Sequence, residues 1–312
     1  METTCVHYSR EYVGSPCIVA IDRDRCVVAD GTGNLTAVDL KPQVVGPRLF
    51  VGVSGGMATN LRSLRSTPAR PWMVAVATRG AYAAIGDLEQ MSVAKIHPVE
   101  GGTVQAVAIS PDGCTLAIGT GSYTAAGPPP AAGLELWDLS PEGGPRFVVS
   151  AAMPGACLDA VMWSPDGARI ACALGMRLQK TGFVAQFDAA RLRALSYFET
   201  PFASASRLGY LDGNTPASRL AVALRGGFRV LDAVDGTEAW RIDRPESPDV
   251  PLDFDVLADE GLVVLNSGLV LDVRDGSTRS RFLAMNDCTS IAARPGGGFI
   301  GASNRGRIYC WD

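Results

Sequence analysis

Residues 104–119 read VQAVAISPDGCTLAIG, and residues 158–174 read LDAVMWSPDGARIACAL. Each stretch has a short apolar run, a Ser-Pro-Asp-Gly turn and a second apolar run. Proline sets the backbone angle φ at the first central position of a tight turn, and glycine tolerates the positive φ that follows. The flanking runs are short and rich in small and β-branched residues, which is typical of strands. Each stretch therefore predicts an antiparallel hairpin.

The hairpin recurs in weaker copies whose turns differ. They read LGYLDGNTPASRLAVAL (208–224), FDVLADEGLVVLN (254–266) and IAARPGGGFIGAS (291–303). A second recurrent feature is an aspartate that closes a short alternating run. Its seven copies are Asp39, Asp87, Asp138, Asp188, Asp232, Asp272 and Asp312. Neighbouring copies lie between 40 (272−232) and 51 (138−87) residues apart, near the ~40–45 residues of a four-stranded propeller blade.

These repeats predict an all-β fold, a single seven-bladed β-propeller domain over residues 1–312 with four antiparallel strands per blade. We call the strands of a blade a, b, c and d from the centre of the ring outwards. The hairpin supplies strands a and b, the aspartate ends strand c, and the following run supplies strand d. Predicted examples of strand d are FVVSAAM (147–153), RALSYFE (193–199) and TEAWRID (237–243).

The two ends of the chain predict how the ring closes. The last repeat stops at Trp311-Asp312, the end of a strand c, and has no strand d of its own. The first complete repeat begins near Cys17, which leaves the alternating segment TTCVHYS (3–9) without a blade. We expect this segment to pair with Arg307–Trp311 as the outer strand of the last blade. Such closure hides open strand edges that would otherwise invite aggregation.

Composition limits the classes of function. The net charge is −4, whereas nucleic-acid binders usually carry a basic excess. The N-terminal residues lack the basic and apolar regions of a secretory signal, and no apolar run is long enough to span a bilayer. We therefore expect a cytoplasmic protein that binds neither nucleic acid nor membrane. The eight cysteines form no CxxC pair and mostly lie in apolar runs, which predicts buried thiols rather than a disulfide framework.

Two dipeptides carry a family resemblance. Trp137-Asp138 and Trp311-Asp312 end strand c, where WD-repeat proteins have their name-giving Trp-Asp pair. With the SPDG turns, they make the whole chain resemble bacterial WD-repeat propellers. The Gly-His pair of a standard repeat is missing, and the only histidines are His7 and His97. The usual histidine–aspartate hydrogen bonds therefore cannot form, the repeat is degenerate, and a related propeller class stays open. The resemblance implies a rigid platform that binds another protein or a peptide.

The repeated aspartates and the tryptophans are expected to serve structure. Each strand-c aspartate should cap the following turn, because Asx side chains hydrogen-bond nearby backbone. The alternative, a ring of functional carboxylates, is the weaker interpretation. The tryptophans all fall in predicted strands and should pack between blades. They are Trp72, Trp137, Trp163, Trp240 and Trp311.

The turns between strands b and c share one face of a propeller with the d–a connections, and we expect the partner there. Five blades have tight glycine turns: Asp30-Gly31, Arg79-Gly80, Arg225-Gly226, Ser267-Gly268 and Arg305-Gly306. The third blade instead inserts residues 121–133 and the adjacent fourth blade inserts residues 175–182. Loops on rigid scaffolds often carry function, although a tolerated insertion is an equal alternative. The predicted contact residues are Tyr123, Pro128, Pro129, Pro130, Met176, Arg177, Gln179 and Lys180.

Four further residues are candidates on the same face. Arg79, Arg225 and Arg305 occupy similar b–c positions and could hold an anionic partner, although solvated turn residues are the simpler explanation. Tyr12 lies in the predicted entry to the first blade, where it could contact a partner or pack against a neighbouring loop.

Enzyme chemistry has little support in the sequence. There is no GxSxG, HExxH or Walker A motif. Asp253 and Asp255 alternate on one face of a predicted strand a, and Asp159 lies similarly in the fourth blade. Propeller lactonases and related hydrolases use acidic and polar residues around a channel-bound metal, but the other blades offer no matching carboxylates.

We therefore predict a non-catalytic interaction scaffold or regulatory subunit, monomeric by itself, that binds a protein or peptide and needs no cofactor or metal. The alternative is a propeller enzyme, lactonase-like or another hydrolase, with a metal or small ligand in the central channel.

Overall fold

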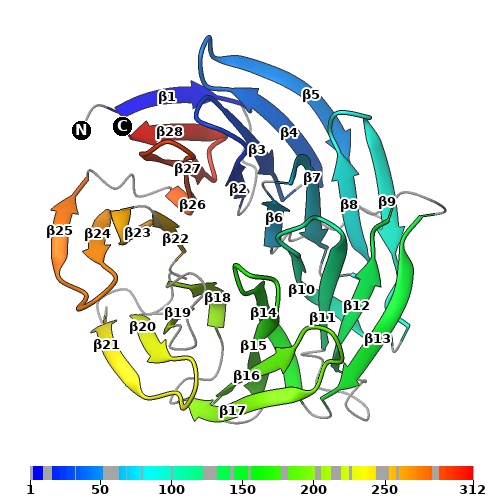
Figure 1. The fold of residues 1–312 in the computed structure, drawn as a ribbon. Helices are drawn as coiled ribbons and strands as arrows, with labels where there is room; N and C mark the ends of the chain where they lie inside the picture. The colour runs from blue at the N-terminus through cyan, green and yellow to red at the C-terminus, as the bar shows by residue number, and fades with distance from the viewer. Residues whose placement is uncertain are drawn as a thin grey trace.

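The computed structural model describes residues 3–9, 16–31, 33–51, 63–67, 69–78, 80–99, 101–121, 132–140, 144–153, 156–176, 182–200, 205–211, 219–224, 227–243, 253–257, 260–282 and 288–311. The fold is all-β, with seven four-stranded antiparallel sheets arranged radially in a ring (Figure 1). This is the predicted seven-bladed β-propeller. The innermost strands surround the centre of the ring, and the outermost strands form its rim.

The first four blades follow the chain in order. Blade 1 comprises β2 (Cys17–Ala20), β3 (Arg25–Ala29), β4 (Asn34–Asp39) and β5 (Val44–Phe50). Blade 2 comprises β6 (Ser63–Thr67), β7 (Arg70–Ala77), β8 (Ala83–Asp87) and β9 (Ser92–Ile96). Blade 3 comprises β10 (Thr103–Ile109), β11 (Thr115–Gly121), β12 (Gly133–Asp138) and β13 (Arg146–Ala152). Blade 4 comprises β14 (Ala156–Trp163), β15 (Arg169–Met176), β16 (Gly182–Asp188) and β17 (Ala194–Thr200).

The remaining blades complete the ring. Blade 5 comprises β18 (Ala205–Tyr210), β19 (Arg219–Leu224), β20 (Gly227–Asp232) and β21 (Glu238–Asp243). Blade 6 comprises β22 (Phe254–Leu257), β23 (Leu262–Leu265), β24 (Leu269–Asp272) and β25 (Thr278–Arg281). Blade 7 comprises β26 (Cys288–Ala293), β27 (Phe299–Ser303), β28 (Arg307–Trp311) and, from the other end of the chain, β1 (Thr3–His7).

The N-terminal strand closes the ring as predicted. β1 runs antiparallel to β28, with Thr3 opposite Trp311 and His7 opposite Arg307. The strand ends two residues before the predicted limit, but the amides of Tyr8 and Ser9 still donate hydrogen bonds to the carbonyl of Gly306 at 2.9 and 3.2 Å. Val6 and Tyr8 belong to the apolar cluster between blades 7 and 1. The closure therefore combines strand pairing with burial.

The two SPDG turns have matching geometry. Gly113 and Gly167 adopt φ of +74° and +71°, in the left-handed region that favours glycine. In blade 3, the hydroxyl of Ser110 accepts a hydrogen bond from the amide of Thr115 at 2.9 Å. In blade 4, Ser164 accepts the amide of Arg169 at the same distance. Serine and glycine thus each have a local role in the turn from strand a to strand b.

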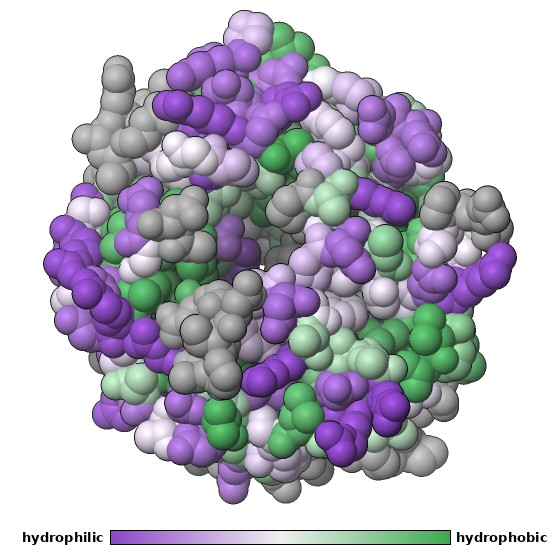
Figure 2. Space-filling model, viewed as in Figure 1, coloured by the Kyte–Doolittle hydropathy of each residue, from purple (hydrophilic) through white to green (hydrophobic). Residues whose placement is uncertain are grey.

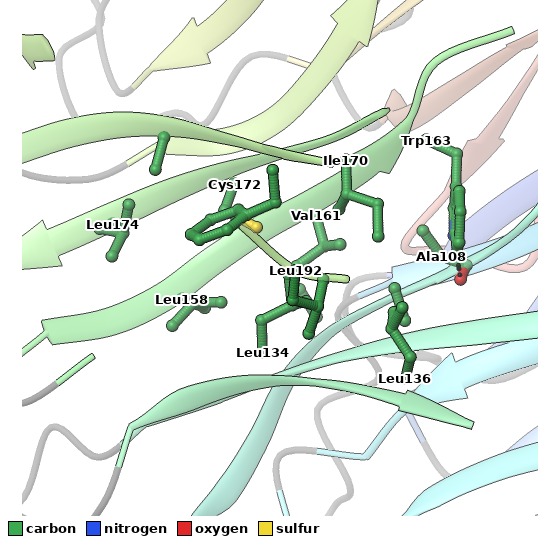
Figure 3. Close-up of a cluster of buried hydrophobic side chains, with 14 of the residues drawn as sticks. Ala108, Leu134, Leu136, Leu158, Val161, Trp163, Ile170, Cys172, Leu174 and Leu192 are labelled. Atoms are coloured by element: carbon green, nitrogen blue, oxygen red, sulfur yellow. Dashed lines mark hydrogen bonds between the residues drawn. The ribbon is translucent and has the colours of Figure 1, made fainter. Parts of the chain in front are cut away.

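The core is divided among the blade interfaces. Seven clusters of buried apolar side chains occur, and each joins one blade to its neighbour. Figure 3 shows the cluster between blades 3 and 4, where Leu134 and Leu136 of β12 face Leu158 and Val161 of β14. Trp163 packs there and donates its indole N–H to the carbonyl of Ala108 at 3.0 Å. The blades therefore depend on each other for burial.

All five tryptophans take part in these clusters, as predicted. Trp163 and Trp311 are buried members of two clusters, and the remaining three pack against other clusters as partly buried side chains. All eight cysteines are thiols, as expected. Five of them are buried: Cys26, Cys157, Cys172, Cys288 and Cys310.

Candidate functional site

Most residues of the predicted binding patch lie outside the described part of the chain. Met176 and Arg305 are the two described members. Met176 is not in a loop, because it is the last residue of β15 and pairs with Ala156. Arg305 is exposed in the b–c turn of blade 7, as predicted. The residues outside the description are Tyr12, Tyr123, Pro128, Pro129, Pro130, Arg177, Gln179, Lys180, Arg79 and Arg225.

The ends of the blade 3 insertion are held firmly. Thr120 of β11 accepts the amide of Gly133 at 3.0 Å and donates to its carbonyl at 3.2 Å. A Cβ on Gly121 would lie 2.6 Å from the Cα of Cys157 in blade 4. The end of β11, where the blade 3 insertion begins, is therefore packed against β14, the inner strand of blade 4. Residues 122–131 are therefore inserted between two strand ends that these contacts hold in place.

A polar residue at the end of strand b is a repeated feature that the sequence prediction missed. Its side chain accepts a backbone N–H in the b–c turn or the adjacent connection. In blade 1, for example, Asp30 accepts the amide of Asn34 at 3.0 Å. The other members are Thr78, Thr120, Asn266 and Ser303. The sequence did contain a signal for this feature. A small or apolar residue is followed by Asp, Thr, Asn or Ser, and a glycine occurs within the next three residues.

The strand-c aspartates cap turns, as predicted. In five blades one carboxylate oxygen accepts the amide two residues later, at 2.7–3.1 Å. These five are Asp87, Asp138, Asp188, Asp232 and Asp272. Asp39 ends β4 at the corresponding position, and Asp312 lies outside the described residues. These carboxylates face their own turns and do not make a ring.

A charged cluster connects the inner strands of blades 5 and 6. The guanidinium of Arg207 on β18 lies 2.8 Å from a carboxylate oxygen of Asp253 and 3.4 Å from one of Asp255. Only 12% of the Arg207 side chain is exposed. Burial opposes its charge, but Asp253 and Asp255 outweigh that effect and raise the pKa of Arg207 above its usual value. The three side chains therefore form a largely buried ionic group, in which Asp255 is the most exposed member at 31%.

The cluster continues into blades 7 and 1. The second carboxylate oxygen of Asp253 accepts the hydroxyl of Ser290 at 2.8 Å and the amide of Ile291 at 2.9 Å. Ser290 in turn accepts the amide of Ile18 in blade 1 at 3.2 Å. One chain of polar contacts thus spans blades 5, 6, 7 and 1, including the junction between the two ends of the chain. We call Arg207, Asp253, Asp255 and Ser290 the inner network.

All four carboxylate oxygens of the inner network are engaged. Those of Asp253 bind Arg207, Ser290 and a backbone amide, as given above. Asp255 accepts the amides of Val256 at 3.0 Å and Ala293 at 2.8 Å through its two oxygens. Within the described residues, no group of three or more histidine, cysteine, aspartate or glutamate side chains is arranged to hold a metal ion. The acidic pair that the sequence singled out therefore stabilises the contact between blades.

The rim of blades 3 and 4 exposes several large apolar side chains. On β13, Phe147 is 40% and Val148 is 55% exposed, and on β17, Leu195 is 45% and Tyr197 is 61% exposed. The ring of Tyr197 stacks on that of Phe183 in the neighbouring strand, with centroids 4.8 Å apart. Figure 2 shows this region of the rim, near β13, as largely hydrophobic. We call the four exposed side chains the blade 3–4 surface.

The rim of blades 5 and 6 is charged. On β21, Asp243 forms ion pairs with Arg229 at 2.5 Å and Arg241 at 3.2 Å. In blade 6, the guanidiniums of Arg274 and Arg279 bind Asp272, and these hydrogen bonds hold the pKa of Asp272 well below its usual value. Figure 2 shows the rim over β25 as strongly hydrophilic. Ion pairs and charged side chains thus cover the rim of blades 5 and 6.

Comparison with known proteins assigns no family. A scan against protein-family models and a search of the curated proteins both find no match to the chain. Among the described residues, no helix has the length and apolar character needed to cross a membrane.

Proposed function

We propose that the protein is a non-catalytic interaction scaffold, of the WD-repeat type or a related class, and that it binds a partner protein or peptide at blades 3 and 4. The observation that carries the proposal is the blade 3–4 surface, because large apolar side chains exposed on two neighbouring blades are typical of interaction sites. Blade 1 also exposes Val44, Val45 and Phe50 on β5. Blades 3 and 4 differ from blade 1 because they combine exposed apolar side chains on the rim with the insertions at residues 121–133 and 175–182.

The arrangement supports a composite site. The two insertions lie on the same blades as the exposed side chains of Phe147, Val148, Leu195 and Tyr197. A partner could therefore contact the insertion residues on the b–c face and the aromatic and aliphatic side chains on the rim. Aromatic side chains such as Tyr197 are common anchors in interfaces, because they bury a large area with few rotatable bonds.

A channel enzyme has less support. The catalytic alternative depended on Asp253 and Asp255 as acidic groups near the centre of the ring. Both carboxylates are engaged by Arg207 and by backbone amides. Binding a metal there would require breaking the inner network and leaving the charge of Arg207 buried without compensation, which is costly.

The test is capture of a partner from an extract of the source organism, followed by mass spectrometry. One variant lacks residues 122–131, a second carries Leu195→Lys and Tyr197→Lys, and a matched control carries Val234→Lys. Val234 is 60% exposed on a turn of blade 5. We expect all three to keep the thermal stability of the wild type. The first two should lose a protein that the wild type and the control both retain. Identical capture by all variants would contradict the proposal.

A further inference from the structure

The outer strand of blade 3 contains the longest stretch without a charge or a proline among the described outer strands. An outermost strand presents backbone donors and acceptors on one side, and proteins usually protect such edges with charges or proline. β13 begins with the exposed Arg146, but it has no charged residue and no proline from Phe147 to Ala152. In contrast, β5 contains Pro47 and Arg48, and the other protected strands carry Lys95, Glu199, Glu238, Arg241, Asp243, Arg279 and Arg281.

The remaining outer strand, β1, also lacks proline and carboxylates. Its sequence is TTCVH, and its apolar residue Val6 is buried between blades 7 and 1. β13 instead directs Phe147 and Val148 to the surface. Among the described outer strands, β13 thus combines the longest uncharged stretch, residues 147–152, with exposed large apolar side chains.

The backbone of β13 is oriented for pairing on its outer side. The sheet order β10-β11-β12-β13 ends on this strand. Met153 donates its amide to the carbonyl of Ala132 at 2.7 Å, on the β12 side. Antiparallel strands alternate between hydrogen-bonded and non-hydrogen-bonded pairs. The preceding pair, Gly133 with Ala152, is therefore a non-hydrogen-bonded pair. Ala152 consequently directs its N–H and C=O away from β12 and towards the rim.

We propose that β13 is a docking strand, to which an extended, uncharged, apolar segment of a partner protein adds as a fifth strand of blade 3. This inference rests on the proposed function and specifies how the partner is held at that surface. Main-chain hydrogen bonds along the edge give affinity, and alternate side chains of the segment pack on Phe147 and Val148. Along residues 147–152, a charged segment would lose hydration without gaining an ionic partner.

The shape of the rim favours a peptide segment over a second copy of this chain. A stable interface between folded proteins usually buries about 1,200 Å² or more in total. Two rims meeting at β13 would curve away from each other on both sides of one seven-residue strand (Figure 1). An extended segment can follow the strand without that geometric limit.

The experiment selects ligands from a library of random displayed peptides on the immobilised full-length protein. Binding of a selected, labelled peptide is then measured by fluorescence anisotropy to the wild type and three variants. Val148→Lys adds a charge to the edge. Ala152→Pro removes one outward N–H at a position where an edge strand tolerates proline. Val234→Lys is the control with similar exposure. We expect uncharged peptides rich in β-branched and aromatic residues, and affinity about tenfold weaker for both β13 variants but unchanged for the control.

Three outcomes would overturn the inference. They are the selection of no peptide, equal binding to Val148→Lys and the wild type, or a dimer of this chain in sedimentation that Val148→Lys dissolves. The last outcome would make a second copy the occupant. If partner capture is lost on changing residues 122–131 or β17 but persists with Val148→Lys and Ala152→Pro, the scaffold proposal stands and the docking strand fails. If peptides bind β13 but capture never depends on blades 3 and 4, the scaffold proposal fails instead.

Discussion

Blades 3 and 4 and blades 5 and 6 use the same four-stranded unit but differ at the rim and near the centre. Blades 3 and 4 meet through an apolar cluster that includes Leu134 and Leu158, and their rim exposes apolar side chains. Blades 5 and 6 also share an apolar cluster, but Arg207 adds ionic contacts between their inner strands, and their rim carries ion pairs. The two regions therefore differ in what they expose: charges cover and connect one side, and large apolar side chains are exposed on the other.

The largest loss of stability should come from disrupting the closure of the ring between blades 7 and 1, which the inner network also reaches. Removing residues 1–9 deletes β1, exposes the edge of β28 and takes Val6 and Tyr8 from the cluster between blades 7 and 1. We expect a loss comparable with the whole stability of a domain, about 5–15 kcal/mol, and therefore no cooperatively folded monomer. Thermal unfolding and size-exclusion chromatography measure this. Removing residues 1–2 alone is the control, and a truncated protein with wild-type melting would contradict the closure.

The next effect tests the charged side. Arg207→Ala leaves Asp253 and Asp255 near each other without their counter-ion, and breaking a buried ion pair in this way usually costs about 3–5 kcal/mol. Urea unfolding measures the change in free energy. Adding Asp253→Asn to Arg207→Ala should recover part of the loss, because it removes one uncompensated charge. Equal stability of Arg207→Ala and the wild type would show that the inner network does not hold blades 5, 6 and 7 together.

A matched substitution tests the apolar side. Leu158 is fully buried between blades 3 and 4, and Leu158→Ala should cost about 3 kcal/mol through lost burial and a residual cavity. The loss should add to that of Arg207→Ala within about 0.5 kcal/mol, as for independent sites. Urea unfolding of both single variants and the double variant checks this. Strong coupling between them would mean that the two sides are not energetically separate.

The smallest effect concerns pH and the charged rim. Arg274 and Arg279 hold the pKa of Asp272 below its usual value, so its stabilising contribution is present above the unfolded pKa of about 3.9. That contribution is lost as the pH falls towards the lower pKa of the folded state. The wild type should therefore exceed Asp272→Asn in unfolding free energy near neutral pH, and the difference should shrink below about pH 4. A difference that grows with acid would contradict the assignment.

The sequence predicted the parts of the fold that repeat locally. The SPDG turns, the strand-c aspartates and the unassigned segment 3–9 predicted seven blades and their closure, because turn chemistry and alternation are properties of short stretches. The same reasoning placed Asp253 and Asp255 near the centre but did not identify Arg207 as their partner, since that contact joins residues of two blades across a sheet face.

The candidate site was harder to predict than the fold. The insertions were located by comparing blades, yet the exposed apolar side chains of β13 and β17 were not recognised as a surface. In sequence, Phe147 and Tyr197 look like ordinary alternating strand residues. Their exposure depends on β13 and β17 being outermost, and their place on neighbouring blades depends on the order of the blades in the ring.

The most direct test of the account is hydrogen–deuterium exchange on the complex purified with its captured partner. Binding at blades 3 and 4 predicts slower exchange of backbone amides in β13 (Arg146–Ala152) and β17 (Ala194–Thr200) than in the unbound protein. It also predicts unchanged exchange in β21 (Glu238–Asp243) and β25 (Thr278–Arg281). Slower exchange at β21 and β25, with β13 and β17 unchanged, would contradict the division of the ring into an interaction side and a charged side.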